Sequence, residues 1–532
     1  MGIQTFKRIR EGGYVYVDKT DLMWHAQNLS PYIFLSRPRR FGKSLLTTTF
    51  ASFFRAEKEL FEGLKVMELE KEWIKYPVIH LDLSMAKGQQ TNETLINSIC
   101  LQLKDFTELY GEDKDEKTPG AILRGIIKRA YQKEQRPVVV IIDEYDAPLL
   151  EVLHKETLDA FREVMQEFYQ PLKASEAMIR FCFITGITKF SQLSIFSGIN
   201  NLTNITMDSA FSAICGITET ELSTYLAEDI AQLAKVYECS PQEMHELLKK
   251  RYDGYHFAKR SEDIYNPFSL FKAFVHREIA SYWFDTGTPS FLLHQMKHFR
   301  TDITAMEEIY ASSAAFDRPT EAMENALPLL YQSGYLTIKG YDRETETYLL
   351  SIPNQEVRVG FVEGLIPTYL GLFTEDIRQG FAIRFWRALK KDDLELALRE
   401  MQTYFAGLPY IEGFKKKLED VTKAEGFYEW TFYLIFSMMN VYVRTQVKTI
   451  RGRADVVIHM PEATYVIELK INGTAQEALD QINSKDHAIP YQTDGRPVHK
   501  VGIRFSTETL AIEDWVVDSR KEQKHNGINV QL

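Results

Sequence analysis

The sequence has few cysteines and no long apolar run. Four cysteines occur among 532 residues, at positions 100, 182, 215 and 239, and no two of them form a C-x-x-C pair. This spacing indicates neither a disulfide framework nor a zinc site, and it suits the reducing cytoplasm, where we expect the protein. No apolar run approaches the ~20 residues that span a bilayer, so no membrane partner is expected. The first residues, "MGIQTFKRIREGG", lack the apolar core of a signal peptide.

Positive charge is also in short supply. The chain has 63 Lys and Arg against 74 Asp and Glu, for a net charge of −11. This balance excludes a chain-wide basic field, so any contact with nucleic acid must come from local basic patches. Internal repeats and low-complexity tracts are missing as well. The length suggests roughly three or four domains, each with enough residues for a core.

Short apolar runs alternate with helical patterns in the first third of the chain. Each run is almost continuously apolar, as in strands that are covered on both faces of a parallel sheet. Helical stretches such as 92–106 lie between them, so an α/β fold class is expected. The expected strands are 31–36, 76–84, 136–146 and 178–188.

The remaining two thirds change character twice. Residues 218–390 are mainly helical, and 330–354 read as two strands around a polar turn, which predicts a lid or winged-helix-like region. From about 390 the pattern opens with helices and then turns to strands, which predicts a second, smaller α/β unit. Its expected strands are 453–459, 463–471 and 500–505. The predicted domains are therefore 1–217, 218–390 and 391–532.

The segment "FLSRPRRFGKSLL" (34–46) lacks one residue of a familiar pattern. A phosphate-binding loop usually reads G-x-x-x-x-G-K-[ST], and Arg37 stands where its first glycine belongs. A predicted strand nevertheless precedes the segment and a predicted helix follows it, which is the context that such a loop needs. Lys43 would then bridge phosphates and Ser44 would reach Mg²⁺. The expected nucleotide-binding residues are Arg37, Pro38, Arg39, Arg40, Phe41, Gly42, Lys43, Ser44 and Leu45.

The strand "VVVIIDEYD" ends in two adjacent acids, Asp143 and Glu144. Asp143 would hold the Mg²⁺ shell and Glu144 would accept a proton from the attacking water. The alternative is a buried strand that ends in carboxylates by chance. Two like charges ~4 Å apart repel by about 4 kcal/mol at an effective dielectric constant of 20, which favours a cation nearby. On the next strand, Thr185 and Thr188 either sense the γ-phosphate or satisfy backbone groups of the loop.

Together, these segments resemble an AAA-ATPase-like family that is often fused to a nuclease-like tail. The resemblance covers roughly residues 1–290, and it implies ATP as the cofactor and ATP hydrolysis as the activity. In that family the loop itself reads RPRRFGKS, so Arg37 belongs to the pattern. Whether Arg37, Arg39 and Arg40 stabilise phosphate charge or form structural ion pairs stays open. The segments are "YVDKT" (16–20), "RPRRFGKS" (37–44), "IIDEYD" (141–146), "ITGITKFS" (184–191), "YDGYHF" (252–257) and "YNPFSL" (265–270).

A second group of residues, Asp455, Glu468 and Lys470, lies in "GRADVVIHMPEATYVIELKIN". Residues i and i+2 of a strand share a face, so Glu468 and Lys470 should lie side by side with Leu469 facing the opposite core. Two carboxylates and an ammonium can bind a metal and activate water. The group resembles the PD-(D/E)xK nuclease pattern, which implies Asp455 and Glu468 as ligands and Lys470 as the residue that positions the water. The alternative is a surface hairpin that matches by chance.

Neighbouring residues support the nuclease interpretation. Glu429 lies in the apolar helix "FYEWTFYLIFSMM", where an unpaired carboxylate is costly, so it is expected as a further metal ligand unless it caps the helix or faces solvent. Gln481, on the helix after the E-x-K strand, is either a polar helper or a surface residue. Arg451 and Arg453 could contact phosphate, whereas the lysines at 415–417 read as a solvated helix face. The aromatic residues of 252–292 are expected to pack rather than to stack on bases.

The sequence therefore predicts a protein that binds and hydrolyses ATP and is fused to a nuclease domain. The nuclease domain is expected to depend on Mg²⁺, with Mn²⁺ as an alternative ion, and to act on DNA under the control of ATP. The expected partners are a nucleotide and DNA, with a homo-oligomer left open, and the expected setting is bacterial defence or a mobile element. The competing hypothesis is an ATP-dependent regulatory or scaffold protein whose nuclease-like domain is an inactive interaction module.

Overall fold

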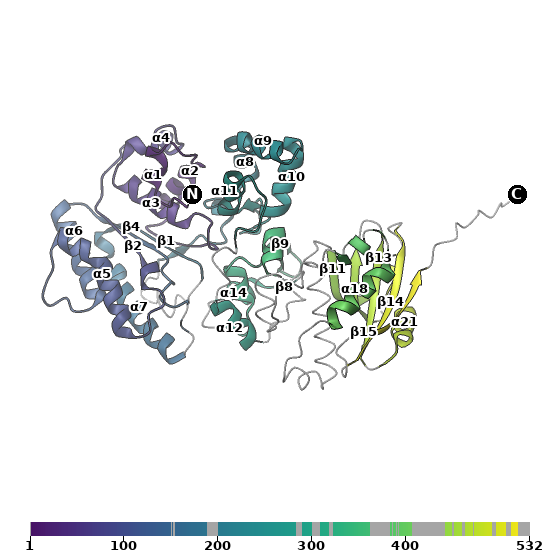
Figure 1. Ribbon diagram of the computed structural model, residues 1–532. Coiled ribbons are helices and arrows are strands. Elements are labelled where there is room, and N and C mark those ends of the chain that lie inside the picture. The colour runs from purple at the N-terminus through teal and green to yellow at the C-terminus, as the bar shows by residue number, and fades with distance from the viewer. Residues whose placement is uncertain are drawn as a thin grey trace. The chain divides into compact units, whose positions relative to one another are not determined.

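A computed structural model shows two compact units, Met1–Gly360 and Phe361–Leu532, which we describe separately (Figure 1). Within the described residues, no helix combines the length and the apolar character that crossing a membrane requires. The structure describes residues 2–150, 152, 155–188, 201–283, 290–299, 309–318, 323–361, 384–385, 387–389, 391, 393–406, 442–449, 452–459, 463–471, 473–491, 496–506 and 512–519.

The first unit is built on a five-stranded sheet with the order β2-β3-β4-β1-β5. All its pairings are parallel, and every residue of β1 and β3 is buried, which confirms the parallel sheet predicted from the apolar runs. Because β4 lies between β1 and β3, the carboxyl ends of these three strands meet at one edge. The strands are β1 (Tyr32–Ser36), β2 (Val78–Asp82), β3 (Val138–Asp143), β4 (Ile179–Gly186) and β5 (Thr203–Asn204).

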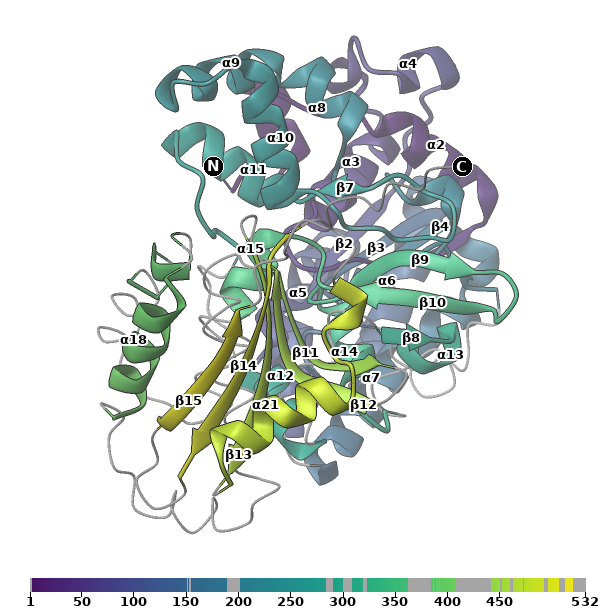
Figure 2. The same cartoon turned by 90° about the vertical axis from the view of Figure 1, so that its right-hand side faces the viewer.

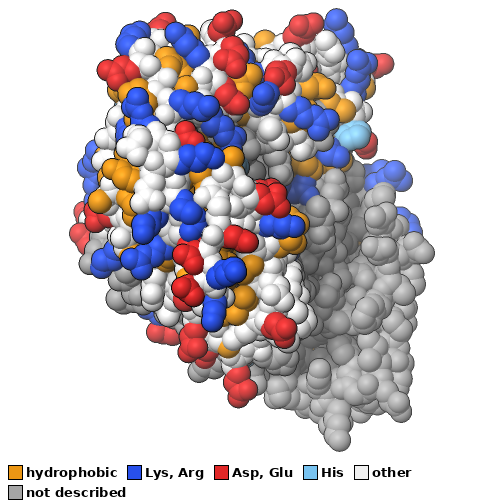
Figure 3. Space-filling model, turned by 90° about the vertical axis from the view of Figure 1, so that its left-hand side faces the viewer, with side chains coloured by type: hydrophobic (Ala, Val, Ile, Leu, Met, Phe, Trp, Pro, Cys, Tyr) orange, Lys and Arg blue, Asp and Glu red, His pale blue; other side chains and the backbone are white. Residues whose placement is uncertain are grey.

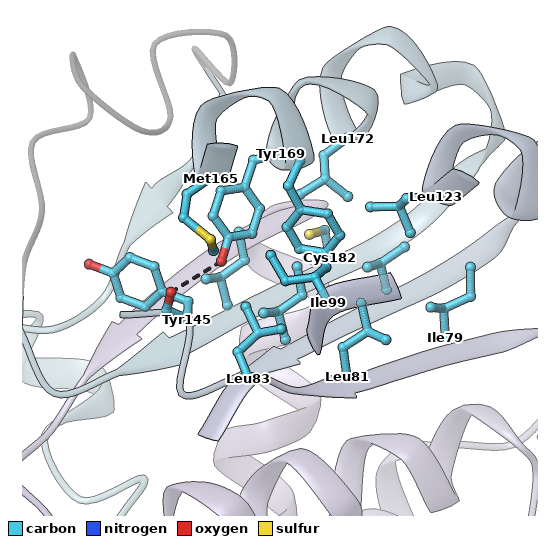
Figure 4. Packing of buried hydrophobic residues seen from close by; sticks show 14 of the residues in the cluster. Ile79, Leu81, Leu83, Ile99, Leu123, Tyr145, Met165, Tyr169, Leu172 and Cys182 are labelled. Carbon is cyan, nitrogen blue, oxygen red and sulfur yellow. Dashed lines mark hydrogen bonds between the residues drawn. The ribbon is translucent and has the colours of Figure 1, made fainter. Parts of the chain in front are cut away.

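Helices cover both faces of this sheet. Apolar side chains of α5, α6 and α7 pack on one face, where Met165 and Leu172 belong to the same buried cluster as Ile79 and Leu81 of β2 (Figure 4). On the other face, the Phe50 ring of α3 packs in a tilted geometry against Phe181 and Phe183 of β4. The helices of this region are α1 (Phe6–Glu11), α2 (Thr20–Leu29), α3 (Lys43–Phe54), α4 (Val66–Leu69), α5 (Asn92–Tyr110), α6 (Pro119–Glu134) and α7 (Lys155–Ala174).

The middle region begins with helices, as its sequence pattern predicts, together with a short antiparallel strand pair that the pattern does not indicate. Thr218, Ser240 and Asn266 each cap a helix by accepting backbone N–H groups, which explains why these helices begin where they do. The elements are β6 (Ile217–Thr218), α8 (Glu219–Tyr225), α9 (Ala227–Val236), α10 (Pro241–Tyr252), β7 (Ile264–Tyr265) and α11 (Pro267–His276).

A three-stranded antiparallel sheet with the order β8-β10-β9 follows (Figure 2). The two strands around a polar turn that the sequence predicts are β9 and β10, while the winged-helix-like arrangement stays a prediction. The elements are α12 (Ser290–His298), β8 (Ile309–Ala311), α13 (Ser313–Phe316), α14 (Leu327–Gln332), β9 (Thr337–Asp342), β10 (Thr347–Ser351) and α15 (Gln355–Gly360).

The second unit contains a sheet with the order β11-β12-β13-β14-β15, in which only β13 and β14 are parallel. Helix α21 connects this parallel pair and packs on one face with Val457 and Val466, while α18 packs on the other face with Leu469. The edge strands β11 and β15 are not among the strands expected from the sequence, because they carry many polar residues and lack a continuous apolar run. The elements are α18 (Leu394–Ala406), β11 (Tyr442–Thr449), β12 (Gly452–His459), β13 (Thr464–Ile471), α21 (Ala475–Ser484), β14 (Val498–Phe505) and β15 (Ile512–Ser519).

Candidate nucleotide and metal sites

The segment RPRRFGKS joins β1 to α3 and turns through two left-handed residues. Arg40 has φ 69° and Gly42 has φ 95°, and Gly42 is the N-cap of α3. A left-handed φ favours glycine, and here it lets the chain reverse so that α3 starts at Lys43. The amino end of this 12-residue helix therefore opens at the carboxyl edge of the sheet, where its N–H groups and dipole favour an anion.

Lys43 is buried within the curve of this loop, with 4% of its surface exposed. Its Nζ donates to the carbonyl oxygens of Arg37 at 3.0 Å and Pro38 at 3.1 Å. The ammonium group is therefore fixed inside the loop, next to the start of α3. This placement fits the phosphate-bridging role that the sequence predicts for it.

Ser44 and Asp143 meet across the edge of the sheet. The Ser44 hydroxyl and the charge of Lys43 both lie close enough to the Asp143 carboxylate to act to lower its pKa. Burial nevertheless raises the pKa of Asp143 to about 6, because the charged form loses hydration. A carboxylate and a hydroxyl are the hard oxygen donors that Mg²⁺ prefers, so the two residues fit that ion.

Glu144 follows Asp143 in a left-handed conformation with φ 51°. This conformation costs a non-glycine residue roughly 1–2 kcal/mol, and such strain tends to occur at functional sites. The side chain is partly exposed, in contrast to the buried Asp143. Glu144 is therefore accessible to water beside the proposed metal residues.

The two threonines of β4 and its following loop are held by other protein groups. The Thr185 hydroxyl donates to the carbonyl oxygen of Leu35 at 2.7 Å, and the Thr188 hydroxyl donates to Asp146 at 2.6 Å. These contacts supply the structural role that the sequence left open, while the sensor role stays a prediction. The sequence analysis missed Asp146, which is fully buried and also accepts the Ile187 N–H at 3.0 Å. Its signal was present as the last acid of "DEYD".

The three arginines of the loop have three different environments. Arg37 is 1% exposed, and its guanidinium donates to the carbonyl oxygens of Thr206 at 2.7 Å and Phe211 at 3.2 Å. These contacts are to backbone carbonyls and not the ion pair considered from the sequence, and they give the side chain a structural role. Nucleotide binding by Arg37 stays a prediction. Burial lowers the pKa of Arg37 to about 10.

Arg40 and Arg39 differ from Arg37. The Arg40 guanidinium lies over the ring of Phe268, 3.7 Å from its centroid. Arg39 is half-buried near Tyr335, whose pKa is raised by burial and lowered by the Arg39 charge. No hydrogen bond or ion pair of the Arg39 guanidinium occurs among the described residues. Arg39 is therefore the arginine of this loop best suited to meet a phosphate.

Aromatic residues of "YDGYHF" pack against the loop. The Phe41 ring lies 4.8 Å from Tyr255 and 5.3 Å from Phe257, both in edge-to-face geometry. The packing role expected for these aromatic residues is confirmed. Earlier in the chain, Lys19 of "YVDKT" pairs with Glu221 of α8.

In the second unit, Glu468 and Lys470 lie on β13 with Leu469 between them. Leu469 packs in the core under α18, which confirms that the E-x-K pair faces the opposite side, toward α21. Lys470 Nζ donates to Gln481 Oε1 on α21 at 2.6 Å, as a polar helper would require. Asp455 precedes Val456, which pairs with Ile467, so the backbone positions of Asp455 and Glu468 are neighbours on adjacent strands.

One residue near Glu468 was missed from the sequence. His487 lies in the turn after α21 and is fully buried, with Nδ1 3.5 Å from Glu468 Oε2. Burial, and then the charge of Lys485, lower the pKa of His487, which favours the neutral ring. No motif marks this residue, because its approach to Glu468 depends on how α21 packs.

Gly502 permits that packing. It pairs with Glu468 across the parallel strands, and a Cβ at this position would lie 2.1 Å from the carbonyl oxygen of Ala475 and 2.7 Å from the Leu479 nitrogen. The glycine therefore lets α21 lie close to the sheet, where Gln481 and His487 reach the E-x-K residues.

Several expected site residues cannot be placed. Glu429, Arg451 and the lysines at 415–417 lie outside the described residues, and Asp455 and Arg453 are described in their backbone positions only. Among the described side chains, no group of three His, Cys, Asp or Glu residues could hold a metal ion. Of the three metal ligands expected in this domain (Glu429, Asp455 and Glu468), only Glu468 has a side chain that the structure describes.

A strand, loop and helix that carry Lys43 and Ser44 beside a strand-end aspartate define the first unit as a P-loop NTPase-type domain. The chain belongs to the AAA-ATPase-like family with a C-terminal domain of the PD-(D/E)XK nuclease superfamily. A family model described as "Predicted AAA-ATPase" matches residues 1–196, and a PD-(D/E)XK nuclease superfamily model matches residues 423–515. A protein of Azotobacter chroococcum mcd 1, described as "Uncharacterized protein in vnfD 5'region", is 32% identical over 538 residues, which cover 98% of each chain.

Proposed function

We propose that the first unit binds and hydrolyses ATP with Mg²⁺. Lys43 and Arg39 contact the phosphates, Ser44 and Asp143 hold the metal, and Glu144 accepts a proton from the attacking water. The observation that carries this proposal is the approach of Ser44 and Lys43 to the Asp143 carboxylate at the amino end of α3. A bound divalent ion supplies charge neutralisation at the phosphates.

The second unit cleaves DNA phosphodiester bonds with Mg²⁺ or Mn²⁺. Asp455 and Glu468 are the proposed metal ligands, and Lys470, held by Gln481, positions the water that attacks phosphorus. Support comes from the buried Glu468 carboxylate, which loses hydration on folding and gains from a cation nearby. ATP hydrolysis controls access of DNA to this site, since both domains are carried by one chain.

Local features, rather than net charge, must attract DNA. On the face of the first unit in Figure 3, Lys and Arg side chains are interspersed with Asp and Glu, which fits the chain-wide charge of −11. We place the protein in the cytoplasm, because all four cysteines are free thiols.

The test is cleavage of supercoiled and linear DNA by the full chain with Mg²⁺ or Mn²⁺, with and without ATP. The wild type should cleave at least a hundredfold faster than Lys470→Ala, and ATP should change the wild-type rate. Cleavage no faster than that of Lys470→Ala under every condition would overturn the nuclease proposal and leave the scaffold hypothesis. An unchanged rate with ATP, ADP and a non-hydrolysable analogue would overturn ATP control alone.

A further inference from the structure

The turn that ends α21 places His487 beneath the helix. Asp486 is left-handed with φ 55°, the His487 N–H donates to the Ile482 carbonyl at 3.1 Å, and the Asp486 N–H donates to the Asn483 carbonyl at 3.4 Å. These two bonds form a Schellman motif, which turns the chain back so that the residue after the left-handed one packs against the helix. That position usually holds an apolar residue, and here it holds a histidine.

The buried imidazole is unusual in its contacts. Both ring nitrogens of His487 are inaccessible to solvent, and neither has a hydrogen-bond partner among the residues that the structure describes. Buried polar groups in proteins are normally satisfied by hydrogen bonds or by a bound ion. The ring therefore points to a ligand as well as to packing.

The distance to Glu468 identifies the kind of ligand. His487 Nδ1 and Glu468 Oε2 are 3.5 Å apart, too far for a good hydrogen bond. Two ligand atoms that each lie ~2.1–2.2 Å from one metal ion are about 3.0–3.1 Å apart in octahedral coordination and about 3.4 Å apart in tetrahedral coordination. The observed separation lies just beyond this range, so a small shift of either side chain brings the nitrogen and the oxygen onto one ion.

We infer that His487 is a nitrogen ligand of the metal ion that Glu468 binds, a role that rests on the proposed metal site of this domain. The described side chains supply these two ligands, and the strand register brings the backbone of Asp455 next to Glu468 for a third. Mg²⁺ takes oxygen ligands, whereas the first-row transition ions accept an imidazole nitrogen, with an affinity that is lowest for Mn²⁺ and rises along the series. His487 thus makes the site selective for Mn²⁺ and similar transition ions over Mg²⁺.

The experiment measures metal binding without DNA or ATP. Mn²⁺ is titrated into the full chain, and the concentration of free Mn²⁺ is followed by electron paramagnetic resonance. The affinity for Mg²⁺ is then obtained from its competition with bound Mn²⁺. His487→Leu introduces the apolar residue that the Schellman motif favours. The metal-free variant should therefore unfold at the same temperature as the metal-free wild type. It should weaken Mn²⁺ binding at least tenfold and change Mg²⁺ binding less than threefold. His487→Gln serves as a second variant and should also weaken Mn²⁺ binding.

A matched control is His499→Leu, which changes a histidine of the same sheet that stacks on Tyr465. Its Mn²⁺ affinity should equal that of the wild type. Equal Mn²⁺ affinities of wild type and His487→Leu, or no Mn²⁺ binding by the wild type, would overturn the inference. If Mn²⁺ binding depends on His487 but the wild type cleaves no DNA, the ligand assignment stands and the nuclease proposal fails. If the wild type cleaves DNA and His487→Leu binds Mn²⁺ with wild-type affinity, the nuclease proposal stands and the ligand assignment fails.

Discussion

The two sites of this chain are assembled from different lengths of sequence. In the first unit, one loop delivers Lys43 and Ser44 to the end of β3, where Asp143, the last residue of that strand, completes the group. In the second unit, Glu468 and Lys470 come from one strand, while the groups that surround them come from α21 and the turn after it. The first arrangement is specified mainly by local backbone geometry, and the second by the packing of a helix on a sheet.

This difference determines which substitutions matter. At the nucleotide site, a substitution far from the loop matters only if it changes the conformation of the loop. Arg37 provides one such connection, because its guanidinium binds backbone carbonyls that lie 169 or more residues away in the sequence. At the metal site, any change that lifts α21 should separate Gln481 and His487 from their partners. The four predictions below test this contrast.

The largest effects are expected when the two chemistries are removed one at a time. Lys43→Ala should lower ATP turnover at least a hundredfold, equivalent to about 3 kcal/mol of transition-state stabilisation. DNA cleavage by this variant without ATP should stay within twofold of the wild type. Lys470→Ala should lower DNA cleavage and leave ATP turnover close to that of the wild type, as measured in DNA-cleavage and phosphate-release assays. Lys128→Ala, at an exposed position of α6, is the matched control. Unchanged hydrolysis in Lys43→Ala would mean that the loop is not the nucleotide site.

The second prediction separates two arginines of one loop. Arg37→Ala should destabilise the first unit by about 3–5 kcal/mol, because the carbonyls of Thr206 and Phe211 lose a charged donor in a buried site. Arg37→Lys should recover less than half of this loss, since an ammonium cannot span the same acceptors. Arg39→Ala should change stability by less than about 0.5 kcal/mol and should raise the KM for ATP. Thermal unfolding measures the stability of each variant, and steady-state kinetics measures the KM for ATP. Equal unfolding midpoints of Arg37→Ala and Arg39→Ala would contradict the different roles of the two arginines.

The third prediction concerns pH. The folded-state pKa of Asp143 is about 6, above its usual value of 3.8, so the folded protein holds this proton more tightly than the unfolded chain. The stabilisation that this proton provides is complete below about pH 4, is lost as the pH rises to about 6, and amounts to about 2–3 kcal/mol. Without Mg²⁺, Asp143→Asn should therefore unfold at a higher temperature than the wild type at pH 7, and the difference should shrink toward pH 4. Parallel curves of melting temperature against pH would contradict this assignment.

The smallest effect is expected from Gly502→Ala. The added methyl group collides with the backbone of α21, so we expect a loss of about 1–2 kcal/mol and a severalfold weaker binding of Mn²⁺. The matched control is Gly340→Ala on β9, where the nearest atom to an added Cβ is 3.7 Å away. Thermal unfolding and Mn²⁺ titration measure the two effects. Normal metal binding in Gly502→Ala would show that the site does not depend on the close approach of α21.

The sequence by itself determined the parts of this protein that depend on local pattern. The parallel sheet follows from continuous apolar runs, and Lys43, Ser44 and Asp143 could be placed because a phosphate-binding loop and a strand-end acid have short-range signatures. The alternation along β13 likewise predicted which way Leu469 faces. In each case, the backbone periodicity of a helix, strand or loop fixes the side chain's direction.

The tertiary structure alone decided the features that depend on distant partners. Arg37 proved to bind backbone carbonyls, Asp146 proved to hold the loop after β4, and His487 proved to lie beside Glu468. The edge strands β11 and β15 were missed for a related reason, since pairing rather than composition defines them. A contact between residues far apart in the chain depends on the packing of whole elements, and no pattern within a short segment encodes it.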